Sequence, residues 1–156
     1  MMVWVLAGLQ LLHVLGGIFW FGSLMMNLFV VLPALRSLPA DAQMTWQRAA
    51  SRRYGRIITP VAALTILLGI GLGIAGGVLG VLGTPYGVTW LVAIVLGGAL
   101  GASGARLTGP TSGLAADEQD PERFSGLLTK LHRYGRMEFG GMMGLVVLMV
   151  AMRFGY

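Results

Sequence analysis

The chain has 156 residues, of which 56% are apolar and only 11% are charged, with a formal net charge of +5. Soluble domains carry roughly a quarter charged residues, so this composition excludes a soluble globular protein and indicates one small domain in a lipid bilayer. The absence of cysteine excludes disulfides, thiolate metal ligands and iron–sulfur clusters. Because the basic residues gather in two hydrophilic segments, they predict membrane topology rather than binding to nucleic acid.

Four apolar runs predict four transmembrane helices. They cover about 3–35, 57–83, 86–105 and 137–155, with hydrophilic loops at 36–56 and 106–136. Each run approaches the ~20 residues that cross ~30 Å of hydrocarbon. The sequence therefore predicts an all-α fold, an integral membrane four-helix bundle formed by residues 1–156 as a single domain.

The two long loops set the predicted orientation. Both are rich in arginine, whereas the link between the second and third runs, 83–85, carries no charge. The positive-inside rule then places both loops in the cytoplasm and both termini outside, and we expect a bacterial inner (cell) membrane. Within the loops, the pattern predicts an amphipathic helix over 40–54 and a flexible acidic segment over 110–121.

The first run carries a polar stripe at seven-residue spacing. The stripe consists of Gln10, His13, Gly17, Trp20, Leu24 and Asn27. Hydrocarbon offers no partner to amide, imidazole or indole groups, so this face should point into protein. Asn27 would then hold the polar edge of a cofactor or form a hydrogen bond across the bundle.

His13 is the sharpest candidate for chemistry, since a histidine within a membrane span is a candidate ligand or proton carrier. Imidazole binds haem iron, copper and zinc. The alternative is a core histidine that is hydrogen-bonded to a neighbouring carbonyl or to Gln10. His132 lies roughly 20 Å to the cytoplasmic side of its helix centre, too far to share a metal with His13, and is predicted to be interfacial.

Methionines of the fourth run fall at the depth of His13. Met149 and Met152 lie roughly 5–9 Å to the outer side of the helix centre, and His13 roughly 7 Å. A histidine and a methionine form an axial pair for haem, and imidazole with thioether also suits Cu(I). Methionine is also common core filler. Glu138, at the start of the same run, is expected to pair with Arg56 or Arg136.

A short repeat and regularly spaced glycines bear on the arrangement of the helices. Arg53-Tyr54-Gly55-Arg56 recurs as Arg133-Tyr134-Gly135-Arg136, which favours two tandem helical hairpins related by a pseudo-two-fold along the membrane normal. The same residues are also typical of anchoring at the headgroups.

Glycines at four-residue spacing, such as Gly69 and Gly73, predict close helix packing and a homodimer through the glycine faces.

Two stretches resemble known families. The stretch from His13 to Leu24, His-Val-Leu-Gly-Gly-Ile-Phe-Trp-Phe-Gly-Ser-Leu, resembles the His-x6-Trp-x-Gly-(Gly/Ser)-Leu opening of the copper-resistance D-type family and of the HemJ-type protoporphyrinogen oxidases. The stretch 52–60, Arg-Arg-Tyr-Gly-Arg-Ile-Ile-Thr-Pro, followed by Thr65 and Gly69, resembles the HemJ-type second helix. The resemblance covers about the first half of the chain and implies haem b with His13 as a ligand.

The chain departs from the HemJ type in two ways: it lacks Pro-Arg after the first-helix tryptophan, and its third predicted helix has no lysine. HemJ-like oxidoreductase activity therefore stays open. We expect a haem b redox protein for electron transfer or for oxidation of a membrane-delivered substrate. Its candidate site residues are Gln10, His13, Trp20, Asn27, Met149 and Met152. The alternatives are a copper protein that binds Cu(I) through His13, Met149 and Met152, and a cofactor-free small subunit of a larger membrane complex.

Overall fold

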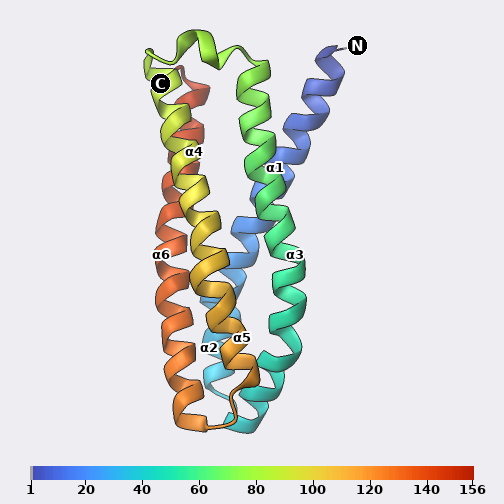
Figure 1. Ribbon diagram of the computed structural model, residues 1–156, viewed down its shortest axis with the longest axis vertical. Helices are drawn as coiled ribbons and strands as arrows, with labels where there is room; N and C mark the ends of the chain where they lie inside the picture. The colour runs from blue at the N-terminus through green and yellow to red at the C-terminus, as the bar shows by residue number, and fades with distance from the viewer. Residues whose placement is uncertain (1) are drawn as a thin grey trace.

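The computed structural model describes residues 2–156 as four long helical units that run up and down one bundle (Figure 1). The first unit is α1 (Met2–Met26), the π-helical turn η1 (Asn27–Val31) and α2 (Leu32–Arg36). The second is α3 (Ala40–Ala75), followed by the 3-10 turn η2 (Val78–Val81). The third is α4 (Pro85–Ser103), the π-helical turn η3 (Gly104–Thr108) and α5 (Gly109–Asp117), and the fourth is α6 (Pro121–Arg153).

Within residues 2–156, all four units are long and apolar enough to cross a membrane, which confirms the predicted all-α transmembrane bundle. α1 packs mainly against α3, and α4 mainly against α6. Both termini and η2 lie at one end, here called the termini end (Figure 1). The two short links, 37–39 and 118–120, lie at the opposite end, here called the arginine-rich end.

The helices extend well beyond the predicted membrane spans, so the predicted boundaries need correction. The segments 36–56 and 106–136, predicted as loops, are almost entirely helical, and α5 occupies most of the segment expected to be flexible. The predicted helix over 40–54 is present as the first part of α3. The 36 residues of α3 span about 54 Å, whereas the hydrocarbon is about 30 Å thick. Hydropathy detects only the lipid-facing part of such a helix.

Local signals explain where these helices begin. The Thr84 hydroxyl accepts a hydrogen bond from the Gly87 N–H at 3.3 Å, and Pro85 takes the first position of α4. Asp120 caps α6 by accepting from the N–H groups of Glu122 and Arg123, before Pro121 at the first turn. The short link 118–120 therefore ends in a strong start signal, which explains why the acidic segment folds.

Two apolar cores are stacked along the bundle. The membrane core is formed by Leu24, Leu100, Met142 and Leu145. The arginine-end core is formed by Leu32, Ala115, Phe124, Leu128 and Leu131. The arginine-end core lies in the parts of the helices that carry the charges. Its apolar contacts hold these parts together outside the predicted membrane spans.

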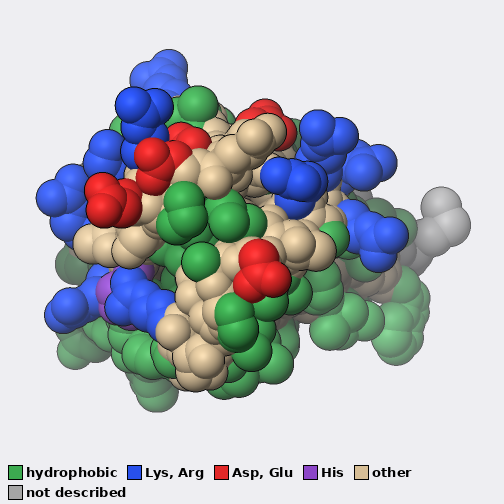
Figure 2. Space-filling view, turned by 90° about the horizontal axis from the view of Figure 1, so that it is seen from below, with side chains coloured by type: hydrophobic (Ala, Val, Ile, Leu, Met, Phe, Trp, Pro, Cys, Tyr) green, Lys and Arg blue, Asp and Glu red, His purple; other side chains and the backbone are tan. Residues whose placement is uncertain are grey.

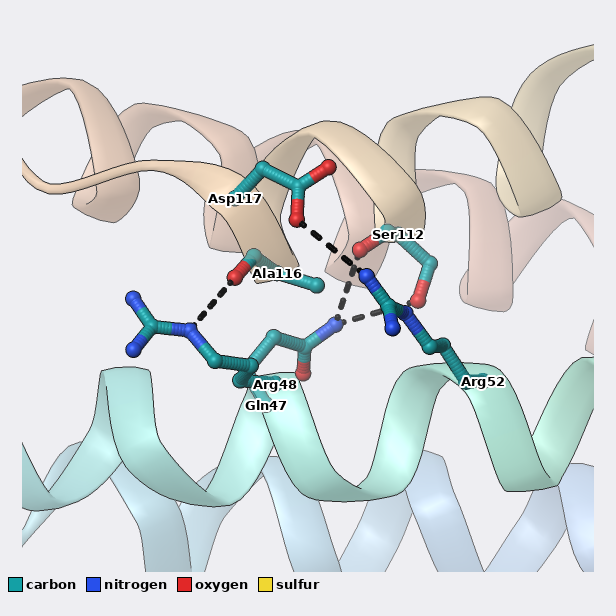
Figure 3. Close-up of polar contacts among 6 residues, drawn as sticks. All are labelled: Gln47, Arg48, Arg52, Ser112, Ala116 and Asp117. Carbon is teal, nitrogen blue, oxygen red and sulfur yellow. Dashed lines mark hydrogen bonds and ion pairs between the residues drawn. The ribbon is translucent and has the colours of Figure 1, made fainter.

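Polar contacts join α3 and α5 at the arginine-rich end (Figure 3). The Gln47 amide donates to the Ser112 hydroxyl at 3.0 Å, and Arg48 Nε donates to the Ala116 carbonyl at 3.2 Å, near the end of α5. Arg52 lies 4.0 Å from Asp117 in an exposed ion pair. Seen from this end, Lys and Arg side chains gather on two opposite sides of the bundle with acidic side chains between them, while the lower edge of the view is hydrophobic (Figure 2).

Glycines allow the close helix contacts in the membrane half. A Cβ atom at Gly16 would collide with the Thr65 hydroxyl, and one at Gly73 would collide with the Trp90 indole. These contacts confirm the predicted tight packing at Gly73, and they are contacts within one chain. The predicted homodimer thus cannot use the Gly73 position as its interface and stays a prediction.

Candidate functional site

His13 lies where α1 and α3 cross, and its ring is held by the backbone of α3. Its Nδ1 atom is 2.8 Å from the Thr65 carbonyl oxygen. A carbonyl can only accept, so Nδ1 carries a proton, and the tautomer that this bond selects has its lone pair on Nε2. Among residues 3–156, Nε2 makes no hydrogen bond. This is the orientation in which a protein presents a histidine to a metal.

Small residues determine how deeply the imidazole sits. A Cβ atom at Gly69 would lie 2.8 Å from Cε1 of His13 and 3.6 Å from its Nε2. Any larger residue at Gly69 would therefore push the ring away from α3. The Thr65 hydroxyl donates to the Val61 carbonyl at 2.8 Å, so it does not compete for the imidazole.

The face of α1 beside His13 is open. Gly17 lies one turn further along the same face, and a Cβ atom there would meet nothing within 4 Å. Trp20, the next member of the predicted stripe, is half-buried and packs against the membrane core. Open space thus begins at Gly17, one turn from an imidazole whose Nε2 makes no hydrogen bond among residues 3–156.

The other predicted site residues do not join His13. Gln10 is exposed. Met149 and Met152 lie on α6 near the termini end, where α1 diverges from α6 (Figure 1). The contacts of α1 with α6 occur nearer the middle of the bundle, as in the stacking of Phe21 on Phe139 with ring centroids 5.7 Å apart. The predicted pairing of His13 with a methionine therefore does not form within one chain.

Asn27 belongs to a second polar cluster, which all four helical units build. At its centre is Glu138 on α6, whose Oε1 accepts from the Thr108 hydroxyl at 2.6 Å and from the Ser103 hydroxyl at 3.2 Å. The phenol of Tyr54, on α3, lies beside the Asn27 side chain and near Glu138. We call these five residues the polar layer.

The polar layer separates the two apolar cores. On α6, Glu138 lies between Leu131 of the arginine-end core and Met142 of the membrane core. Both π-helical turns lie at the same level: η1 begins at Asn27, and η3 ends at Thr108. Such turns are often found at functional sites, since they widen the helix and re-aim its side chains.

Two buried polar atoms lack a hydrogen-bond partner among the described residues: Asn27 Oδ1 and His132 Nδ1. Asn27 places its free acceptor in the polar layer. His132 lines a surface hollow of about 530 Å³ with Thr129, Arg133, Arg136 and Met137. A second hollow, of about 400 Å³, lies on the apolar surface of α4. Neither hollow borders His13.

Sequence reasoning found Glu138 but assigned it the wrong partner. Its hydrogen-bond partners are Thr108 and Ser103, and in the described part of the chain it forms no ion pair with Arg56 or Arg136. Ser103, Thr108 and Tyr54 were missed as members of a site. The available signal was that Glu138 is the one acidic residue inside a predicted membrane span.

The fold and these two clusters define an integral membrane four-helix bundle with polar groups at two depths. No family model, no curated protein and no solved structure matches this chain. The resemblance of the first two helices to the copper-resistance D-type and HemJ-type families therefore stays a prediction.

Proposed function

We propose that this chain is an integral membrane haem b-binding redox protein in which Nε2 of His13 is the axial ligand. The observation that carries the proposal is the hydrogen bond from His13 Nδ1 to the Thr65 carbonyl. A bond of this kind fixes the tautomer and ring orientation of a metal-binding histidine and raises the basicity of the other nitrogen.

The surroundings of His13 also fit a flat cofactor. Gly17 leaves space on the open face of α1, and the aromatic Trp20 follows on the same face, packed against the membrane core. Gly69 lets the imidazole sit against α3. When bound to one histidine, haem supplies one-electron chemistry whose potential depends on its ligands and on solvent access. We expect a membrane-delivered reductant or oxidant as the partner in electron transfer.

This chain supplies one ligand in the proposed site. Met149 and Met152 are on a helix that diverges from α1 at that end, so we assign them no role in binding iron. The same separation weakens the copper alternative, because Cu(I) needs His13 and a methionine together. Haem is therefore the better supported of the two cofactors.

The test is an absorption spectrum of the purified protein, oxidised and then reduced with dithionite, from cells with adequate haem supply. We expect a Soret band with reduced α and β bands in the wild type and in Met149→Ala, Met152→Ala and His132→Ala. His13→Ala should lose the bands. His13→Gly should regain them on addition of imidazole, which separates loss of the ligand from loss of the fold.

Gly69→Ala offers a finer measurement. The added methyl group would meet the His13 ring, so the Soret maximum or the midpoint potential should shift while the total haem stays near wild type. A featureless wild-type spectrum that stays featureless after addition of haemin would overturn the proposal. Co-purification of a defined membrane complex in that case would favour the cofactor-free subunit.

A further inference from the structure

We propose that Glu138 is a proton-binding carboxyl group, and that the polar layer holds an exchangeable proton inside the bundle. This site is independent of His13, which lies nearer the termini end on another helix. Four features of the layer support this assignment: its depth, the lack of an ion pair to Glu138 among the described residues, the hydroxyl donors around the carboxyl group, and the free acceptor at Asn27.

The depth of Glu138 makes a permanent negative charge costly. Val146 is at the centre of the predicted fourth span, and Glu138 precedes it by eight residues, or roughly 12 Å along the helix. That distance keeps the carboxyl group within the ~30 Å hydrocarbon layer. Ionisable side chains at such depths face the bundle interior and mark proton or ion pathways.

No basic side chain of the described residues forms an ion pair with Glu138. The only ion pair within residues 3–156 joins Arg52 to Asp117, and it lies in the arginine-rich half. Arg56 and Arg136, the basic residues expected to pair with Glu138, are exposed, and Arg56 Nε donates to the Arg52 carbonyl instead. A carboxylate at this position can lose its charge only by binding a proton or another cation.

The groups that face Glu138 favour a proton over a metal ion. Ser103 and Thr108, from the third helical unit, donate to its Oε1, Tyr54 of α3 lies near it, and Asn27 of η1 lies beside Tyr54. Tyr54 is the only other titratable side chain among them, and a phenol is neutral near pH 7. In the described part of the chain, no cluster of three His, Cys, Asp or Glu residues is present to hold a divalent ion.

The layer can accommodate both states of the carboxyl group. Two hydroxyl donors at Oε1 stabilise the ionised form. The Asn27 Oδ1 acceptor is buried and has no partner among the described residues, so the layer also holds an unused acceptor for an O–H donor. The layer thus holds hydroxyl donors for the ionised carboxyl group and a spare acceptor for an O–H group, so a proton can be gained or lost there without unfolding the helices.

The experiment uses dicyclohexylcarbodiimide, an apolar reagent that modifies protonated carboxyl groups. The intact protein in detergent is treated at several values between about pH 5 and pH 9, the range in which a buried carboxyl titrates. Peptide mass spectrometry then compares Glu138 with Glu122, an exposed glutamate of the same helix. We expect Glu138 to be labelled at least tenfold faster than Glu122, and its labelling to fall as the pH rises.

Variants test the role of each group. Glu138→Gln should lose the label, and Glu138→Asp should retain it, which keeps the test valid if one of them folds poorly. Thr108→Val removes the 2.6 Å hydrogen bond to the ionised form, so the midpoint of labelling should move to higher pH. His13→Ala should label like the wild type, which distinguishes failure of this proposal from failure of the haem proposal.

Three results would overturn the inference. Labelling of Glu138 no faster than that of Glu122 would mean that the carboxyl group is an ordinary surface acid. Labelling that does not change with pH would exclude an exchangeable proton. Suppression of labelling by sodium chloride, but not by choline chloride at the same ionic strength, would assign the site to Na⁺ instead.

Discussion

The membrane core and the arginine-end core are built from similar side chains, but they stand in different solvents. Around the arginine-end core, the outer faces of α3, α5 and α6 carry charges, and burial of Phe124 and Leu128 removes apolar surface from water. Around the membrane core, the outer faces are apolar, and lipid is as good a solvent for leucine as protein is. Stability therefore comes from burial in one half and from close packing in the other.

The polar contacts follow the same division. In the arginine-rich half they tie neighbouring helices together, as Gln47 does with Ser112. In the membrane half, they are concentrated at two positions, His13 with Thr65 and Glu138 with its hydroxyl donors. Because unsatisfied polar groups are expensive in lipid, a side chain retained there is more informative about function than one at the charged end.

The largest expected effect is the loss of stability on truncating a core leucine of α6, and two such leucines can be compared. Leu128 and Leu145 are 3% and 8% exposed and belong to different cores. We expect Leu128→Ala to reduce the free energy of opening by about 3 kcal/mol. Leu145→Ala should cost about half as much, because lipid replaces part of the lost apolar contact. Hydrogen exchange of α6 amides in detergent micelles measures both. An equal or larger loss of stability for Leu145→Ala would contradict the view that burial from water stabilises one half of the bundle and close packing in lipid the other.

The next effect tests close packing in the membrane half. A methyl group at Gly73 would collide with the buried Trp90 indole, so Gly73→Ala should destabilise the protein by about 2 kcal/mol. Gly71→Ala is the matched control, since its methyl group would meet nothing within 4 Å. The control should be neutral or slightly stabilising through its helix propensity. Thermal unfolding in detergent compares the two, and equal midpoints would refute the packing argument.

The smallest effects belong to the polar contacts of the arginine-rich half. Gln47 is 5% exposed, so Gln47→Ala should cost about 1 kcal/mol by leaving its partner on α5 less satisfied. Arg52→Ala breaks an ion pair whose side chains are 74% and 76% exposed, and should change the unfolding midpoint by too little to measure. A larger loss for Arg52→Ala that disappears at high salt would contradict this ranking.

Much of the membrane half could be predicted from the sequence, because hydropathy reports the lipid directly. Composition and spacing predict three of its features: the four spans, the close packing at Gly73, and the contact of His13 with another helix. The helical structure of 106–136 did not follow, since its charges resemble those of a solvated loop. Its buried residues, such as Phe124 and Leu128, are too widely spaced for a hydropathy average to detect.

The sites were only partly predictable, because they depend on how helices are rotated against one another. Seven-residue spacing placed Gln10, His13, Trp20 and Asn27 on one face, yet Gln10 is exposed and the others contact three different surroundings. α1 leans across the bundle, so a straight stripe meets α3 at His13 and the polar layer at Asn27 (Figure 1). Met149 was predicted as a partner for His13 because the two residues lie at the same depth along the membrane normal. Equal depth does not show how far apart α1 and α6 lie in the membrane plane.

The continuity of the helices at the arginine-rich end has a practical consequence. The chain has 11 lysines and arginines. Arg36 and Arg153 are the last residues of α2 and α6, and the other nine lie inside helical segments of the arginine-rich half. Trypsin needs an extended substrate, so it can cut at these positions only when the helix that carries them opens. The rate of tryptic cleavage in intact membranes therefore reports how often this half of the bundle opens, without any probe being added to the protein.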